Sequence, residues 1–395
     1  MRSKLFNAII IVIILILCML LSACNRNKAD NSKDTLFINS FNAISKEGIF
    51  LSDNGVMTYY DYITGKETVL CTRLQCNHEV YDKDTNPNPD CPAVSSDKYS
   101  INCVFIANGI LYFTTEGPRN SEKGLMTSKL YKADLNGENR VYLGVIDYDL
   151  RVFDTYIYEN YIFGIINSIK VVSNEEGIVD TESTLQAVAI NLNTLETVYL
   201  SEPDEITDAI QPYVYDGKLY CTFRNAHNDM YEIRIFSLED FTLIDTIQVK
   251  GYSYIKYSKE YMYYSYFNEG TEEINLCKKS LRTGKVTTLH IFDDSENVSC
   301  GLFTVTGDHI FYNLLYYDGV SSAEDRGTYV FDMKDDSITE VDFSYSGVYT
   351  PVFAAVDDEH ILLRYTEKGK VVYRYMKAVD FINKSMDFID IRPSQ

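Results

Sequence analysis

The sequence predicts an all-β fold, a seven-bladed β-propeller that follows a lipoprotein signal peptide. Three observations support the propeller: a segment pattern that recurs seven times, turn residues at matching places in the repeats, and a composition suited to strands. Tyrosine is abundant, with 33 residues, whereas tryptophan is absent and only 8 prolines occur. Aromatic residues favour strands and proline interrupts their hydrogen bonding, so this composition is typical of sheets.

The first element is an export signal. A basic segment, Met1 to Lys4, precedes an apolar run from Leu5 to Leu21, and Ser22-Ala23-Cys24 follows directly. Small residues before a cysteine allow a signal peptidase to reach and cleave the backbone, and the cysteine is then lipidated. We expect residues 1–23 to be removed and lipidated Cys24 (palmitate and diacylglycerol) to anchor the chain at the outer face of the cell membrane. The alternative, an uncleaved transmembrane anchor, also leaves the remaining chain outside.

The charge of the chain narrows the classes of partner. Loss of Arg2 and Lys4 with the signal would take the net charge from −21 to −23. Nucleic-acid binding needs clustered basic residues, so this class is disfavoured. We expect a monomer that meets the membrane through its lipid and binds a protein, peptide or glycan.

Seven repeats fill the chain after the signal. In each, a turn residue precedes a short apolar or aromatic triplet, with a mean step of about 52 residues, as in propeller blades. The seven turn positions are Gly48, Gly109, Asn160, Gly217, Glu260, Asp308 and Glu359. We therefore expect a polar tether over residues 24–35 and the propeller over residues 36–395.

A second marker recurs downstream of each turn, a strand followed by a polar turn and another strand. These turns begin at Asp61, Asp134, Asn191, Ser237, Ser280, Asp332 and Asp380. Asn108-Gly109 and Asp216-Gly217 supply the positive φ that tight hairpins need. Two hairpins per repeat make one four-stranded blade, and six or eight blades are the nearest alternatives to seven.

The alternation of Gly-x-[Leu/Ile]-Tyr hairpins with polar turns resembles the propeller-containing surface lipoproteins of clostridia and related Gram-positive bacteria, a family of unknown function. The segment from Cys71 to His78, followed by Asp90-Cys91-Pro92-Ala93, resembles a Cys-x4-Cys-x-His element of those lipoproteins. In this chain an insert rich in Asp, Asn and Pro lengthens the gap between His78 and Cys91.

Cys71, Cys76, His78 and Cys91 form a candidate metal set, because three thiolates and an imidazole suit Zn²⁺. The alternative for the same cysteines, outside the membrane, is that they form disulfides or remain unpaired thiols, and Cys103 lies nearby. Either a structural zinc ion or disulfides would hold the long loop in place. Within it, oxygen side chains alternate from Asp82 to Asp90, but the pattern departs from a calcium loop and favours a solvated turn.

The long connections are predicted to gather at one end of the propeller. Because strands alternate in direction, the second connection of each blade and the link to the next blade share an end. The inserts at residues 114–128, 168–183, 224–230 and 315–328 are second connections, and the cysteine loop is a link. We expect a binding surface there, whose candidate ligand-binding residues are His227, Asp229, Tyr316, Tyr317 and Asp318.

Enzyme motifs are missing from the sequence. It contains no G-x-S-x-G, H-E-x-x-H, G-x-x-x-x-G-K-[ST] or G-x-G-x-x-G pattern. We therefore expect a non-enzymatic binding module that acts through the loop-rich face. The alternative is an extracellular glycosidase or lyase that acts on polysaccharide through carboxylates in the central channel, since propellers assemble such sites from distant blades.

Overall fold

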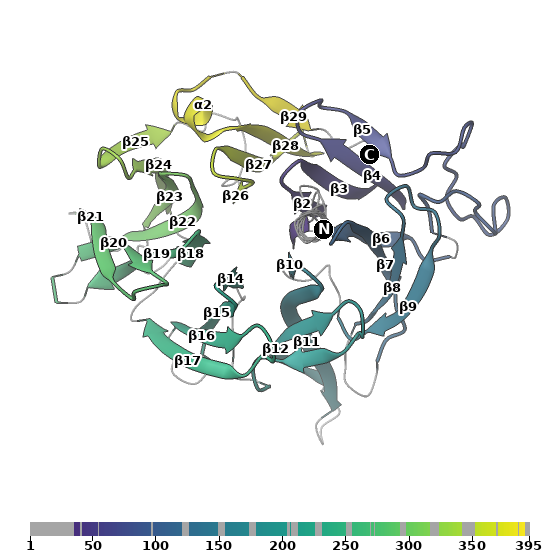
Figure 1. The fold of residues 1–395 in the computed structure, drawn as a ribbon, viewed down its shortest axis with the longest axis horizontal. Coiled ribbons are helices and arrows are strands. Elements are labelled where there is room, and N and C mark those ends of the chain that lie inside the picture. Colours follow the sequence, from purple (N-terminus) through teal and green to yellow (C-terminus); the bar gives the residue numbers. More distant parts are fainter. Residues whose placement is uncertain are drawn as a thin grey trace, which may run out of the picture.

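A computed structural model describes residues 35–39, 42–53, 55–95, 98–120, 126–148, 155–173, 179–203, 206, 212–225, 231–249, 255–268, 270–271, 273–292, 298–316, 324–341, 352–368, 370–385 and 387–391. The chain forms a ring of seven four-stranded antiparallel blades around a central axis (Figure 1). The predicted seven-bladed propeller is therefore confirmed, and six and eight blades are wrong. The export signal, residues 1–23, and Cys24 lie outside the described residues.

The blades follow one another along the chain. Blade 1 contains β2 (Asn42–Ser45), β3 (Gly48–Asp53), β4 (Val56–Asp61) and β5 (Glu67–Val69). Blade 2 contains β6 (Ile101–Ala107), β7 (Ile110–Glu116), β8 (Ser128–Ala133) and β9 (Val141–Ile146). Blade 3 contains β10 (Thr155–Tyr158), β11 (Tyr161–Ser173), β12 (Val179–Asn191) and β13 (Thr197–Tyr199). Blade 4 contains β14 (Tyr213–Tyr215), β15 (Lys218–Arg224), β16 (Tyr231–Ser237) and β17 (Leu243–Val249).

The remaining blades repeat this plan. Blade 5 contains β18 (Ile255–Ser258), β19 (Tyr261–Asn268), β20 (Glu273–Ser280) and β21 (Val286–Phe292). Blade 6 contains β22 (Val298–Thr306), β23 (His309–Tyr316), β24 (Glu324–Asp332) and β25 (Ser337–Val341). Blade 7 contains β26 (Val352–Ala355), β27 (His360–Glu367), β28 (Lys370–Lys377) and β29 (Ile389–Ile391).

The predicted turns occupy their expected places, with one exception. Asn108-Gly109 and Asp216-Gly217 have positive φ at both residues, as two-residue hairpins require. In blade 7, however, the segment beginning at Asp380 forms part of a short helix, α2 (Ala378–Ile382), where we predicted a polar turn. Phe381 of α2 is buried against Phe311 of blade 6. The helix therefore packs on the preceding blade in place of the predicted turn. The described part of the chain has no helix long and apolar enough to span a membrane.

The third connection of each blade packs on the preceding blade. Phe241, between β16 and β17, has a φ of 57° and contacts the rings of Tyr161 and Phe163 in blade 3. Leu195 holds the same repeat position, with a φ of 62°, and packs in the core shared by blades 1 to 3. A left-handed conformation is unfavourable for these residues, and burial of their side chains between blades offsets that strain.

The ring closes without exchange of a strand between its ends, since blade 1 and blade 7 each consist of four consecutive strands. Apolar side chains of both blades fill the seam, including Ile44, Ile49, Leu362 and Tyr373. Tyr62 of blade 1 stacks on Tyr375 of blade 7, with ring centroids 4.5 Å apart. Packing therefore closes the ring.

An additional strand, β1 (Thr35–Asn39), lies inside the ring. It pairs antiparallel with β2 of blade 1 and with β10 of blade 3, and thereby joins these two blades into one nine-stranded sheet. It also lies next to β6, the inner strand of blade 2. The N-terminal strand thus lines the channel along three successive blades.

Candidate metal centre

The link from β5 to β6 carries the cysteine and histidine cluster. Both ends of this link are held by β4: the Met57 N–H donates to the Ala93 carbonyl at 2.7 Å, and the Leu70 N–H donates to the Met57 carbonyl at 2.9 Å. Ala93 and Val94 are fully buried. The link therefore leaves the blade and returns to it at neighbouring positions, with the cluster between them.

The structure brings the four predicted metal ligands together. One donor atom from each of Cys71, Cys76, His78 and Cys91 lies within 4.8 Å of the others. The Nδ1 atom of His78 is 3.3 Å from the Sγ atom of Cys91. Positive φ values at Gln75 and His78 turn the backbone so that the short segment faces Cys91. This cluster could hold a metal ion.

The donor set fits zinc better than a hard cation, because thiolates and imidazole are its usual ligands. Donor atoms of a tetrahedral zinc site, with Zn–S near 2.3 Å, are separated by about 3.7 Å, so a contraction of about 1 Å would complete the site. Four protein ligands fill the coordination sphere. A site of this kind is structural, since a catalytic zinc site keeps one position open.

Two backbone N–H groups point at the thiols. Burial raises the pKa of Cys91 to about 12, although the Ala93 N–H, 3.3 Å from Sγ, acts in the opposite direction. Hydrogen bonding from the backbone of His78 lowers the pKa of Cys76. Zinc binds thiolates, so metal binding would release these protons, and affinity would fall in acid.

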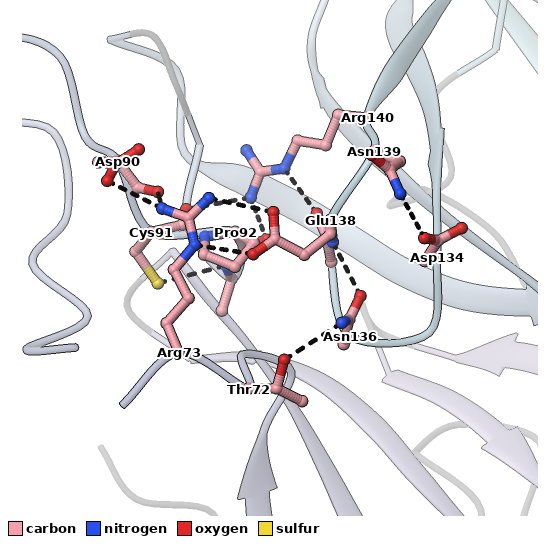
Figure 2. Close-up of polar contacts among 12 residues, drawn as sticks. Thr72, Arg73, Asp90, Cys91, Pro92, Asp134, Asn136, Glu138, Asn139 and Arg140 are labelled. Carbon is pink, nitrogen blue, oxygen red and sulfur yellow. Dashed lines mark hydrogen bonds and ion pairs between the residues drawn. The ribbon is translucent and has the colours of Figure 1, made fainter. Parts of the chain in front are cut away.

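An arginine pair fastens the cluster to blade 2 (Figure 2). Arg73 donates from Nε to Oε1 of Glu138 at 2.7 Å and from Nη2 to Oε2 at 3.0 Å. Its Nη1 atom lies 2.9 Å from the carboxylate of Asp90. Arg140 donates to the carbonyls of Cys91 and Pro92. Both guanidinium groups would balance the negative charge that three thiolates bring to a zinc site.

The turn between β8 and β9 is in close contact with the link. Gly137 has a φ of +79°, and a Cβ atom there would lie 2.3 Å from the Pro92 carbonyl oxygen and 2.8 Å from that of Leu70. Asn136 donates to the Thr72 hydroxyl at 3.2 Å (Figure 2). A glycine is therefore required at position 137 both for its backbone angle and for space.

Sequence reasoning missed Arg73, Glu138 and Arg140. The sequence predicts a polar turn that begins at Asp134, but nothing in the sequence indicates which segment this turn contacts. The only available signal was Arg73, which lies between Cys71 and Cys76. That signal is weak because a contact between residues 65 positions apart leaves no local pattern.

The three clustered cysteines, Cys71, Cys76 and Cys91, form no disulfide in the structure. Cys103 is fully buried in β6 and is not part of the cluster. Cys221, Cys277 and Cys300 are buried in the strands of blades 4, 5 and 6. These three fill the role of small apolar side chains.

The acidic stretch inside the link forms a turn. The Oδ1 atom of Asp82 accepts from the N–H groups of Asp84 and Thr85 at 2.9 and 2.7 Å. The backbones of Asp82 and Asn86 also bond reciprocally. The solvated turn predicted over this stretch agrees with these contacts.

The predicted ligand-binding residues are described only in part. Tyr316 is the last residue of β23, where its backbone pairs with Val298 and Glu324. His227, Asp229, Tyr317 and Asp318 lie outside the described residues. Strand order places all four between the second and third strands of their blades.

One expectation about the loops needs correction. Residues 168–183, predicted as an insert, belong largely to β11 and β12, which pair from Tyr161↔Asn191 to Ser173↔Val179. The cysteine link extends outward from the circumference of the ring (Figure 1), and its Arg73 contacts Glu138 in the third connection of blade 2.

Known proteins resemble the chain in structure only. No family model and no curated protein matches the sequence. The β-propeller domain of the Trilobed protease from Pyrococcus furiosus is 12% identical, with a TM-score of 0.45 over 75% of this chain and 86% of that chain. An oligogalacturonate lyase in complex with manganese is 13% identical, with a TM-score of 0.46 over 84% and 85%. Pyrococcus horikoshii acylaminoacyl peptidase is 12% identical, with a TM-score of 0.47 over 75% of this chain, which spans 46% of that protein.

Proposed function

We propose that this chain is a lipid-anchored, extracytoplasmic binding module that contacts a protein partner without transforming it. In this proposal Cys24 carries the lipid, and Cys71, Cys76, His78 and Cys91 hold a structural zinc ion. The zinc ion fixes the link between blades 1 and 2 and supplies no chemistry. The partner-binding surface is the end of the ring that carries the second connections.

The long hairpin of blade 3 is the observation that carries the proposal. β11 and β12 each contain 13 residues, whereas the other strands contain three to nine. β10 pairs with β11 only at Tyr161 to Phe163, and β13 pairs with β12 only at Val188 to Ile190. The remaining part is a two-stranded ribbon that extends past the ring (Figure 1).

A ribbon of this kind suits recognition of an extended peptide. Among the described residues no strand of the propeller pairs with the ribbon beyond Ile165↔Ala187, and the edge of a two-stranded ribbon is the kind of element to which an extended peptide adds a strand. Two-stranded ribbons are marginally stable by themselves, and contact with a partner would add the missing strand. We therefore assign the ribbon as the main contact element and the connections carrying His227, Asp229, Tyr316, Tyr317 and Asp318 as its neighbours.

The inner strand β1 supports binding over catalysis in the central channel. A glycosidase of the alternative kind needs carboxylates from several blades facing an open channel. In the described residues, β1 covers the inner strands of blades 1 to 3. On that side the channel is therefore lined by β1, whose sequence from Thr35 to Asn39 contains no carboxylate.

Peptide and glycan arrays test the proposal with the soluble chain that starts at Asn25. We expect binding to extended peptides, and loss of that binding in a variant that joins Ile166 to Gln186 through Asn-Gly. Asp216→Ala, at the opposite end of the ring, is the matched control and should bind normally. Cleavage of an arrayed oligosaccharide would favour the enzyme instead, and peptide binding that survives ribbon removal would refute the assignment of the ribbon.

A further inference from the structure

The direction of β1 determines from which end of the ring the N-terminal segment leaves. β1 is antiparallel to β2, with Thr35 opposite Ser45 and Asn39 opposite Asn42. Ser45 is the last residue of β2, directly before the first connection of blade 1. The chain preceding Thr35 therefore enters the ring from the end that carries the first connections, close to the axis.

From this geometry we infer that the propeller stands on the membrane with its first-connection end toward the bilayer and its second-connection end outward. The inference depends on the lipid at Cys24, which belongs to the proposed function. It adds the orientation of the surface: the ribbon of β11 and β12 and the other second connections are presented away from the cell, to partners in the surroundings or on another surface.

The length of the tether opposes the reverse orientation. Cys24 precedes Thr35 by 11 residues, which span at most about 38 Å when fully extended. In the reverse orientation the tether would have to run outward across a blade, about 14 Å wide, and then along the outside of the ring, about 23 Å high. These two lengths together nearly equal the fully extended length of the tether. The distance from the channel axis to the blade would lengthen the path further. A flexible chain of 11 residues has a root-mean-square span of only about 18 Å.

Adsorption to lipid headgroups is not the source of the orientation. The described first connections are mainly acidic and include Glu47, Glu159, Asp216, Glu260, Asp308, Asp357, Asp358 and Glu359. Lys259 and Lys334 are engaged with Asp358 and Asp308 at 3.0 and 2.9 Å. An acidic surface is repelled by anionic lipids, so the tether alone must set the orientation, and the ring should stand off the headgroups.

Energy transfer from the ring to the membrane tests the inference. The lipidated full chain is placed in phosphatidylcholine vesicles whose outer leaflet contains rhodamine lipid. A lysine analogue carrying a donor dye replaces either Asp216, an exposed residue in a first connection, or Thr271, an exposed residue in a second connection. We expect transfer at least about twofold stronger from position 216, given a ring height of about 23 Å, and the same ratio with phosphatidylglycerol added.

The controls separate the orientation from the anchor. Wild-type protein should float with the vesicles, and Cys24→Ser should not. If wild type fails to float, the lipid anchor is refuted and the orientation with it. If it floats and position 271 transfers equally or better, the orientation alone is refuted.

Discussion

Arg73 and Glu138 form a two-point ion pair across 65 positions of the chain, with N–O distances of 2.7 and 3.0 Å. This pair fastens the link that carries the cysteine cluster to the outer turn of blade 2. The propeller thus holds its candidate metal centre at the circumference, between two blades.

A double-mutant cycle measures the strength of this pair. Arg73→Ala and Glu138→Ala should show a small but measurable coupling in the free energy of unfolding, because both side chains are about one-third exposed. The coupling should shrink in 1 M salt, which screens exposed charges. Additive effects of the two substitutions in urea titrations would mean that the pair does not fasten the link.

Zinc content distinguishes the four clustered residues from the other cysteines. Protein purified with zinc should contain one ion per chain, and Cys76→Ala should lose it and unfold at a lower temperature. Cys103→Ala is the matched control, since Cys103 is buried near the cluster without belonging to it. Elemental analysis measures the content, and equal zinc in both variants would contradict the assigned ligands.

Gly137 should tolerate no side chain. Gly137→Ala places a methyl group against two backbone carbonyls in addition to its unfavourable φ, and we expect a loss of about 3 kcal/mol. Gly109→Ala has a similar φ of +70° but no atom within 4 Å of the added carbon, so about 1 kcal/mol should be lost. Equal losses of unfolding free energy for the two variants, measured with denaturant, would show that the turn at Gly137 is not in close contact with the link.

The seam between blades 7 and 1 should weaken in acid. Burial raises the pKa of Asp357, but hydrogen bonds from the Glu359 and His360 N–H groups and the His360 ring outweigh it, so the pKa lies below its ordinary value. The stabilisation is fully present above about pH 4 and is lost as pH falls through the depressed pKa. His360 also stacks on Tyr375, which lies in the seam.

Urea unfolding at pH 6 and pH 3 tests this dependence. Asp357→Asn should destabilise the protein at pH 6 and matter progressively less as the pH is lowered to 3, because the wild-type carboxyl loses the same contacts on protonation. Asp216→Asn, on an exposed turn, controls for removal of one charge. A constant difference between wild type and Asp357→Asn across this range would contradict the role of the ionised carboxylate.

The fold was predictable because each blade repeats the same local rules. Asn108-Gly109 and Asp216-Gly217 mark hairpins wherever they occur, and the sevenfold step fixed the blade number. Local rules also identified Cys71, Cys76, His78 and Cys91. They could not reveal β1, which pairs with strands of two different blades, nor the contact of Gly137 with Pro92, because both depend on how distant segments meet. The insert at residues 168–183 was mistaken for a loop because polar residues there alternate with β-branched ones, a pattern that a ribbon exposed on both faces also produces.

X-ray absorption at the zinc edge tests the metal centre most directly. On the full chain loaded with one equivalent of zinc, we expect three sulfur scatterers at about 2.3 Å and one nitrogen at about 2.0 Å, as for a closed Cys₃His site. A first shell dominated by oxygen, or disulfide formation that leaves no thiolate for zinc, would contradict the account.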